Sequence, residues 1–235
     1  MKRILFIAIL FVMPFLLQAQ LIELPKMKVP GLKWETAYQF DKVNHLKVDY
    51  YDKKGRLKQS HDYEIYYQQN GKDFCVKLIT GKTDIETVFD LKNESVVQTF
   101  SSKGTESMYN ATRFTFPDES KAKRIELKPT GEKREILGLE CEAFIYTLRN
   151  QTGKAWIAAS EQMSNDYGIF RASKMGMFHN TLSTGGFVVE IETEDTNGNR
   201  TLMQTISLRN NASYKATFDG VNMGTAINKV SYFNF

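Results

Sequence analysis

The sequence predicts a mainly β protein: a curved antiparallel sheet, or incompletely closed β half-barrel, with one inserted amphipathic helix. Two observations predict the sheet. Short segments alternate apolar and polar residues, and Gly, Asn and Asp separate them at even intervals. These segments are rich in β-branched and aromatic residues, which pleated, half-buried surfaces favour. A third observation, a change to helical spacing between residues 160 and 185, predicts the helix.

The predicted strands follow one another along the chain with turn residues between them. Asn70-Gly71 and the Asn-Gly-Asn at 197–199 are typical of tight hairpins. Cys75 alternates with Phe74 and Val76, on the face that we expect to be more exposed because Lys77 shares it. A turn and a terminal strand occupy residues 217–235. The other predicted strands are 47–51, 63–68, 74–80, 86–91, 95–100, 123–128, 141–148, 155–159, 187–193 and 202–208.

The predicted helix carries the candidate ligand-binding residues. Met175, Phe178 and Leu182 fall at i, i+3 and i+7, which places them on one helical face. Methionine-rich surfaces adapt to varied apolar ligands, so this face could form a lid over a ligand. The alternative is a helix that plugs the sheet as ordinary core. The candidate residues are Met163, Phe170, Met175, Met177, Phe178 and Leu182.

The N-terminal residues predict export. Lys2 and Arg3 precede an apolar run from Ile4 to Leu17, and Gln18-Ala19-Gln20 offers a small residue for cleavage. That run is shorter than the ~20 residues of a membrane-spanning helix. We therefore expect a cleaved leader over 1–19, an extended arm over 20–40 and a single β-rich domain over 41–235. The product is expected to be periplasmic and soluble, with no transmembrane span and no lipid anchor.

Charge and residue spacing exclude several functions. Loss of Lys2 and Arg3 leaves 29 basic against 27 acidic residues, a net charge of +2 without a basic patch, so we expect no nucleic-acid partner. His45, His61 and His179 lack metal-ligand spacing, and no phosphate-binding or hydrolase motif is present. Glu190, Glu192 and Glu194 share one strand face and are expected to be solvated. We expect no metal, no cofactor and no enzymatic activity.

Cys75 and Cys141 leave two structural alternatives open. Cys141 alternates with Ala143 and Ile145, which predicts a buried position where a thiol behaves as a small hydrophobe. Glu140 and Glu142 beside it would raise its pKa and disfavour a nucleophile. Two cysteines in an oxidising compartment could instead form a Cys75–Cys141 disulfide.

One segment resembles a known family. Thr130-Gly131-Glu132-Lys133, an Ile136-x-Gly138-x-x-Cys141 core and a strand with Trp156 follow in the order seen in the Bacteroidota periplasmic family called domain of unknown function 4412. The resemblance covers about residues 64–208 and includes TVFDLKNESVVQTF and the hairpin from Gly186 to Gly198. It implies a fold like that of the lipoprotein-localisation factors, a half-barrel with a helical lid. That family has no established activity.

Two functions remain as hypotheses. The first is a carrier for an apolar ligand, a lipid or acyl chain, enclosed by the sheet and the helix. The second is an envelope protein-interaction or structural module with a filled core and no small ligand.

Overall fold

The computed structural model describes residues 29–79, 81–115, 126–148, 151–161 and 186–231. Within these ranges the chain forms strands and no helix. The predicted helix lies at 162–185, outside the described residues. The strands are β1 Ala37–Phe40, β2 Lys42–Tyr51, β3 Leu57–Tyr67, β4 Phe74–Ile79, β5 Thr83–Asp90, β6 Ser95–Ser102, β7 Met108–Thr115, β8 Lys128–Ile136, β9 Leu139–Leu148, β10 Gln151–Ala158, β11 Phe187–Asp195, β12 Arg200–Arg209, β13 Tyr214–Thr217 and β14 Met223–Ser231.

Twelve strands form one curved sheet that does not close. Their order is β14-β7-β6-β5-β4-β3-β2-β12-β11-β10-β9-β8, so β14 and β8 are its two edges. Neighbouring strands are antiparallel, except that β14 runs parallel to β7. β12 lies between β2 and β11, and this placement joins the two meanders of the chain into one sheet. The expected fold class, a mainly β curved and incompletely closed sheet, is confirmed.

Residues with positive φ form the turns of two hairpins. Leu137 and Gly138 both have positive φ (55° and 77°), and they join β8 to β9 in a two-residue turn. This pair of positive angles defines a type I′ turn, whose twist matches that of the flanking strands. Gly198, with φ of 77°, turns β11 into β12 as the Asn-Gly sequence predicts.

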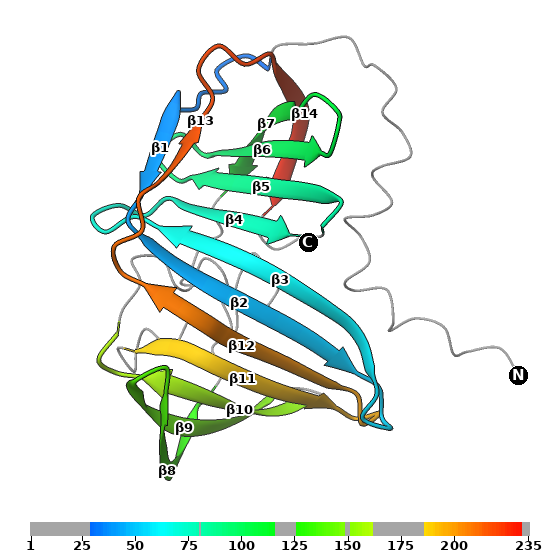
Figure 1. Ribbon diagram of the computed structural model, residues 1–235, viewed down its shortest axis with the longest axis vertical. Helices are drawn as coiled ribbons and strands as arrows, with labels where there is room; N and C mark the ends of the chain where they lie inside the picture. The colour runs from blue at the N-terminus through cyan, green and yellow to red at the C-terminus, as the bar shows by residue number, and fades with distance from the viewer. Residues whose placement is uncertain (1–28, 80, 116–125, 149–150, 162–185, 232–235) are drawn as a thin grey trace, which may run out of the picture.

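The sheet has two faces, which we name by their residues. The inner face carries Leu46, Ile65, Phe74, Phe89 and Val96, which cross-strand pairing aligns over neighbouring strands. The outer face carries the residues that alternate with them. In Figure 1 the small β1–β13 sheet stands beside the left ends of β4, β5 and β6, while β7 lies behind β6.

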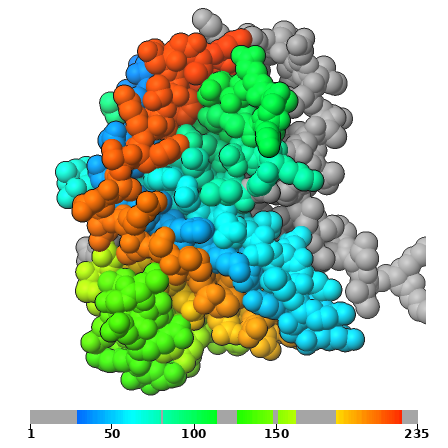
Figure 2. All heavy atoms as spheres, viewed as in Figure 1, coloured from blue at the N-terminus to red at the C-terminus, as the bar shows by residue number. Residues whose placement is uncertain are grey.

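β1 and β13 cover the outer face over β2 to β6. Tyr38 and Phe40 from β1 pack with Tyr66, Cys75 and other outer-face residues in a second buried cluster. Tyr214 of β13 stacks on Tyr66 with ring centroids 4.1 Å apart. Figure 2 shows the β13 segment over this end of the molecule and the β8–β9 hairpin at the opposite end. Residues 37–40 of the predicted arm thus form β1.

Two sequence expectations need correction. Cys75 was expected on an exposed face, but it is fully buried because β1 and β13 pack over β4. The strand expected at 123–128 overlaps β8 at Lys128 alone, and residues 123–125 lie outside the described part of the chain. β8 instead runs through Thr130 to Lys133, where a bulge between Pro129 and Lys133 interrupts its pairing with β9.

Candidate functional site

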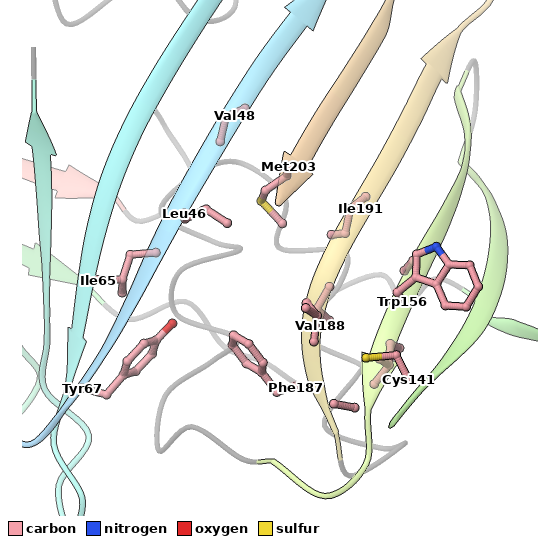
Figure 3. Close-up of a cluster of buried hydrophobic side chains, with 14 of the residues drawn as sticks. Leu46, Val48, Ile65, Tyr67, Cys141, Trp156, Phe187, Val188, Ile191 and Met203 are labelled. Atoms are coloured by element: carbon pink, nitrogen blue, oxygen red, sulfur yellow. The ribbon is translucent and has the colours of Figure 1, made fainter. Parts of the chain in front are cut away.

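The largest apolar cluster extends along the inner face of the twelve-stranded sheet. Its buried residues come from nine strands: β2 to β6 and β9 to β12. Figure 3 shows Leu46 and Val48 of β2, Ile65 and Tyr67 of β3, Met203 of β12 and Phe187 and Ile191 of β11 gathered in this cluster. The cluster forms a continuous buried apolar layer over most of the sheet.

Aromatic packing orders two regions of this cluster. Phe74 and Phe89 are directly opposite each other on β4 and β5, and their rings stack with centroids 4.4 Å apart. Tyr146 lies opposite Gly153, where a side chain of any size would collide with the tyrosine ring. The Tyr146 hydroxyl forms a 2.5 Å hydrogen bond with the Thr193 hydroxyl, so its polar atom is satisfied inside the core.

A shallow hollow of about 370 Å³ opens at one end of β12. The β8–β9 turn contributes Leu137 and the start of β9 contributes Leu139. From β12 come Ile206, which lies within the bulge between Thr205 and Ser207, and Ser207 and Leu208 after it. Glu161 and Asn210 complete the lining. Leu137 is 49% exposed and Ile206 43% exposed, so both apolar side chains are accessible at this hollow.

Both cysteines are free thiols in the structure. Cys75 belongs to the cluster under β1 and β13, and Cys141 belongs to the large cluster, with five strands between β4 and β9 in the sheet order. Burial raises the pKa of Cys141, and it raises the pKa of Cys75 well above its usual range. A thiolate is therefore disfavoured at both positions, which is the behaviour of a core thiol.

Two glutamates of the acidic ladder on β11, Glu190 and Glu192, are paired with arginines. Arg134 Nη2 donates to Glu190 Oε1 at 2.6 Å, and Arg200 Nη1 donates to Glu192 Oε1 at 2.9 Å. The Arg134 guanidinium also lies 4.1 Å from the centre of the Trp156 ring. In the described ranges, no group of three or more His, Cys, Asp or Glu side chains could hold a metal ion.

A buried carboxylate group was not predicted from the sequence. Asp90 is fully buried and accepts hydrogen bonds from the Tyr38 hydroxyl at 2.7 Å and from Asn93 Nδ2 at 2.7 Å. Asp73 accepts the Leu91 N–H at 2.9 Å, and burial raises its pKa. The Asp-x-x-Asn spacing of the β5–β6 turn was the available clue. The bonds from Asn93 and Leu91 hold the β5–β6 turn, and the bond from Tyr38 joins this turn to β1.

The candidate ligand-binding residues of the predicted helix, Met163, Phe170, Met175, Met177, Phe178 and Leu182, lie outside the described residues. His45 and His61 lie on neighbouring strands, β2 and β3, while His179 is outside the described ranges. Among the residues described, no helix has the length and apolar character needed to cross a membrane.

The fold and its apolar cluster define a mainly β domain built on one open sheet. No family model matches the chain, and no curated protein matches it. Among solved structures, two crystal forms of PNGF-II are similar, with TM-scores of 0.41 and 0.39 and 15% identity in both. They cover 81% and 79% of this chain, which spans 32% and 31% of theirs. A DUF1329 family protein from Desulfovibrio piger has a TM-score of 0.23 and 10% identity over 78% of this chain and 88% of that chain.

Proposed function

We propose that this chain is an exported, non-enzymatic binding or carrier domain for an apolar ligand, a lipid or acyl chain, in the cell envelope. The observation that carries the proposal is the apolar cluster that spans nine strands of a sheet left open at both edges. Burial of apolar surface is the dominant favourable term when a lipid chain binds a protein. The charged, apolar and small-residue order of residues 1–20 supports export.

We also propose membership of the domain of unknown function 4412 family. The residues that carry the resemblance, from Thr130 to Trp156, lie on the consecutive strands β8, β9 and β10. Cys141 of this motif is packed in the large cluster, which fits a structural cysteine.

A non-enzymatic role is supported by the chemistry of the reactive groups. Burial keeps both thiols in their protonated form. Glu190 and Glu192 bind arginine side chains, and ion-paired carboxylates of this kind are ordinary features of a strand surface.

Exposed apolar residues favour a second candidate, the envelope protein-interaction module. Met108, Leu137, Ile145 and Ile206 are each more than 40% exposed. Of these, Leu137 and Ile206 lie together at the hollow, and a group of accessible apolar side chains can form the centre of a protein interface.

Titration of the parent chain with a neutral fluorescent naphthylamine probe separates the two functions. The carrier predicts saturable binding that Leu46→Ala weakens, because Leu46 belongs to the inner-face cluster. Val43→Ala is the matched control: Val43 is also a buried β2 residue but belongs to the cluster under β1 and β13. Absence of saturable binding by the parent, with both variants only destabilised, would instead establish the filled-core module.

A further inference from the structure

Two buried polar atoms on the inner face lack hydrogen-bond partners among the described residues. Asn44 is 3% exposed and Thr205 is 4% exposed. Asn44 Oδ1 and Thr205 Oγ1 have no partner within the part of the chain that the structure describes. Buried polar atoms are normally hydrogen-bonded, so each such exception calls for an explanation. Thr193, another buried threonine of the same sheet, bonds the Tyr146 hydroxyl and shows the usual arrangement.

The two atoms belong to neighbouring positions of adjacent strands. Thr205 of β12 lies opposite Leu46 of β2, and Asn44 lies two residues before Leu46 on the same side of β2. Alternate residues of a strand share a face, so Asn44 and Thr205 both belong to the inner face. The bulge after Thr205 brings Leu208 opposite Asn44. A polar spot thus interrupts an otherwise apolar surface.

The hollow at the end of β12 adjoins this polar spot. Its wall includes Ser207 and Leu208, which directly follow the bulge, and Leu208 is the cross-strand neighbour of Asn44. Apolar side chains form much of the remaining lining. A ligand in the hollow would therefore meet leucine and isoleucine side chains. Asn44 and Thr205 lie next to this lining but outside it, Asn44 opposite Leu208 and Thr205 directly before the bulge.

The charges at this hollow already neutralise each other. Glu161 lies in its lining and forms an ion pair with Lys42 at 3.4 Å, while Asn210 Nδ2 donates to the second carboxylate oxygen of Glu161 at 3.3 Å. Because the Lys42–Glu161 pair is neutral overall, it gives an anionic headgroup no net attraction. Asn44 Oδ1 can only accept a hydrogen bond, so its ligand must donate one.

We propose that Asn44 and Thr205 bind the uncharged hydrogen-bond-donating group, a hydroxyl or amide, of an amphiphile whose apolar chain lies against the inner face. This inference rests on the proposed carrier function and specifies the class of ligand. A hydroxyl donates to Asn44 Oδ1 and accepts from the Thr205 hydroxyl, which satisfies both atoms. An alkane leaves them unsatisfied, and a carboxylate supplies no donor.

Competition binding with chains of equal length tests the inference. Lauryl alcohol and laurate are titrated against the parent chain loaded with the neutral naphthylamine probe. We expect lauryl alcohol to displace the probe at about fivefold to tenfold lower concentration than laurate, the range expected for one net hydrogen bond. Asn44→Leu and Thr205→Val should each bring the two displacing concentrations, corrected for the variant's own affinity for the probe, to within about twofold of each other. Both variants should fold, because each removes an unsatisfied polar atom from the core.

Thr193→Val is the matched control. It removes a buried hydroxyl that already has a partner, so it should lower stability while preserving the preference for the alcohol. Equal displacement by alcohol and laurate, or a preference that survives both Asn44→Leu and Thr205→Val, would overturn the inference and leave the carrier function standing. Failure of the parent to bind the naphthylamine probe would overturn the carrier function and the inference together.

Discussion

Val96 and Val97 are adjacent in β6 and point to opposite faces of the sheet. Val96 is 2% exposed and packs in the inner-face cluster, whereas Val97 is fully buried under β1 and β13. Replacing either with alanine removes two buried methyl groups from one strand. The pair therefore compares the two cores with chemically identical changes.

Each substitution should cost about 2 kcal/mol in the free energy of unfolding. Burial of each methyl group contributes about 0.8 kcal/mol, and the residual cavity adds to the cost. For a domain of this size, that loss lowers the melting temperature by about 4–8 °C. Urea unfolding followed by the fluorescence of Trp34 and Trp156 would report both variants, with equal m-values for each.

The two variants should differ only in ligand binding. Val96→Ala should also weaken binding of the neutral naphthylamine probe, and Val97→Ala should not. A cost below about 0.5 kcal/mol for Val96→Ala, beside a full cost for Val97→Ala, would show that the inner face is not the packed core described above. Loss of probe binding in Val97→Ala alone would place the ligand site on the outer face and contradict a site on the inner face.

Three further changes have defined outcomes. Cys141→Ala should lower stability by about 1–2 kcal/mol without abolishing ligand binding, and a variant as stable as the parent but unable to bind would contradict its structural role. Asp73→Asn should raise the urea midpoint at pH 7. Burial raises the pKa of Asp73 in the folded protein above its value in the unfolded chain. Its stabilising contribution is therefore present below the unfolded pKa and is lost as the pH rises through the folded pKa. The stability gained by Asp73→Asn should consequently vanish below about pH 4. Leu137→Asn should stabilise the type I′ turn by about 1 kcal/mol and weaken probe binding at the hollow; an unchanged thermal midpoint would argue against strain at that residue.

Strands with strong alternation could be predicted from their own residues. In β11 the buried residues Val189, Ile191 and Thr193 alternate with Glu190, Glu192 and Glu194, and Asn197-Gly198 specifies the β11–β12 turn. The sequence predicts this strand at 123–128 instead of at β8. Most residues of β8 are exposed at the sheet edge, so apolar and polar residues do not alternate along it. β1 and β13 have four residues each, too few for a period to be recognised.

Contacts between residues far apart in the sequence could not be predicted from local patterns. Lys77 made the Cys75 face look exposed, yet the Lys77 ammonium lies 4.8 Å from the centre of the Tyr214 ring, over a face that β13 covers. Asn44 and Thr205 are far apart in sequence, and only the β2–β12 register and the bulge bring them to one place. Neither the register nor the bulge can be predicted from the residues of one strand alone, so the sequence could not predict the polar spot.

Native mass spectrometry of the chain purified from its own cell envelope tests the carrier function most directly. We predict one bound molecule per chain, released on unfolding and identified as an uncharged amphiphile with a hydroxyl or amide group. A folded chain that carries no small molecule, and that fails to take up lauryl alcohol when it is supplied, would contradict the carrier function.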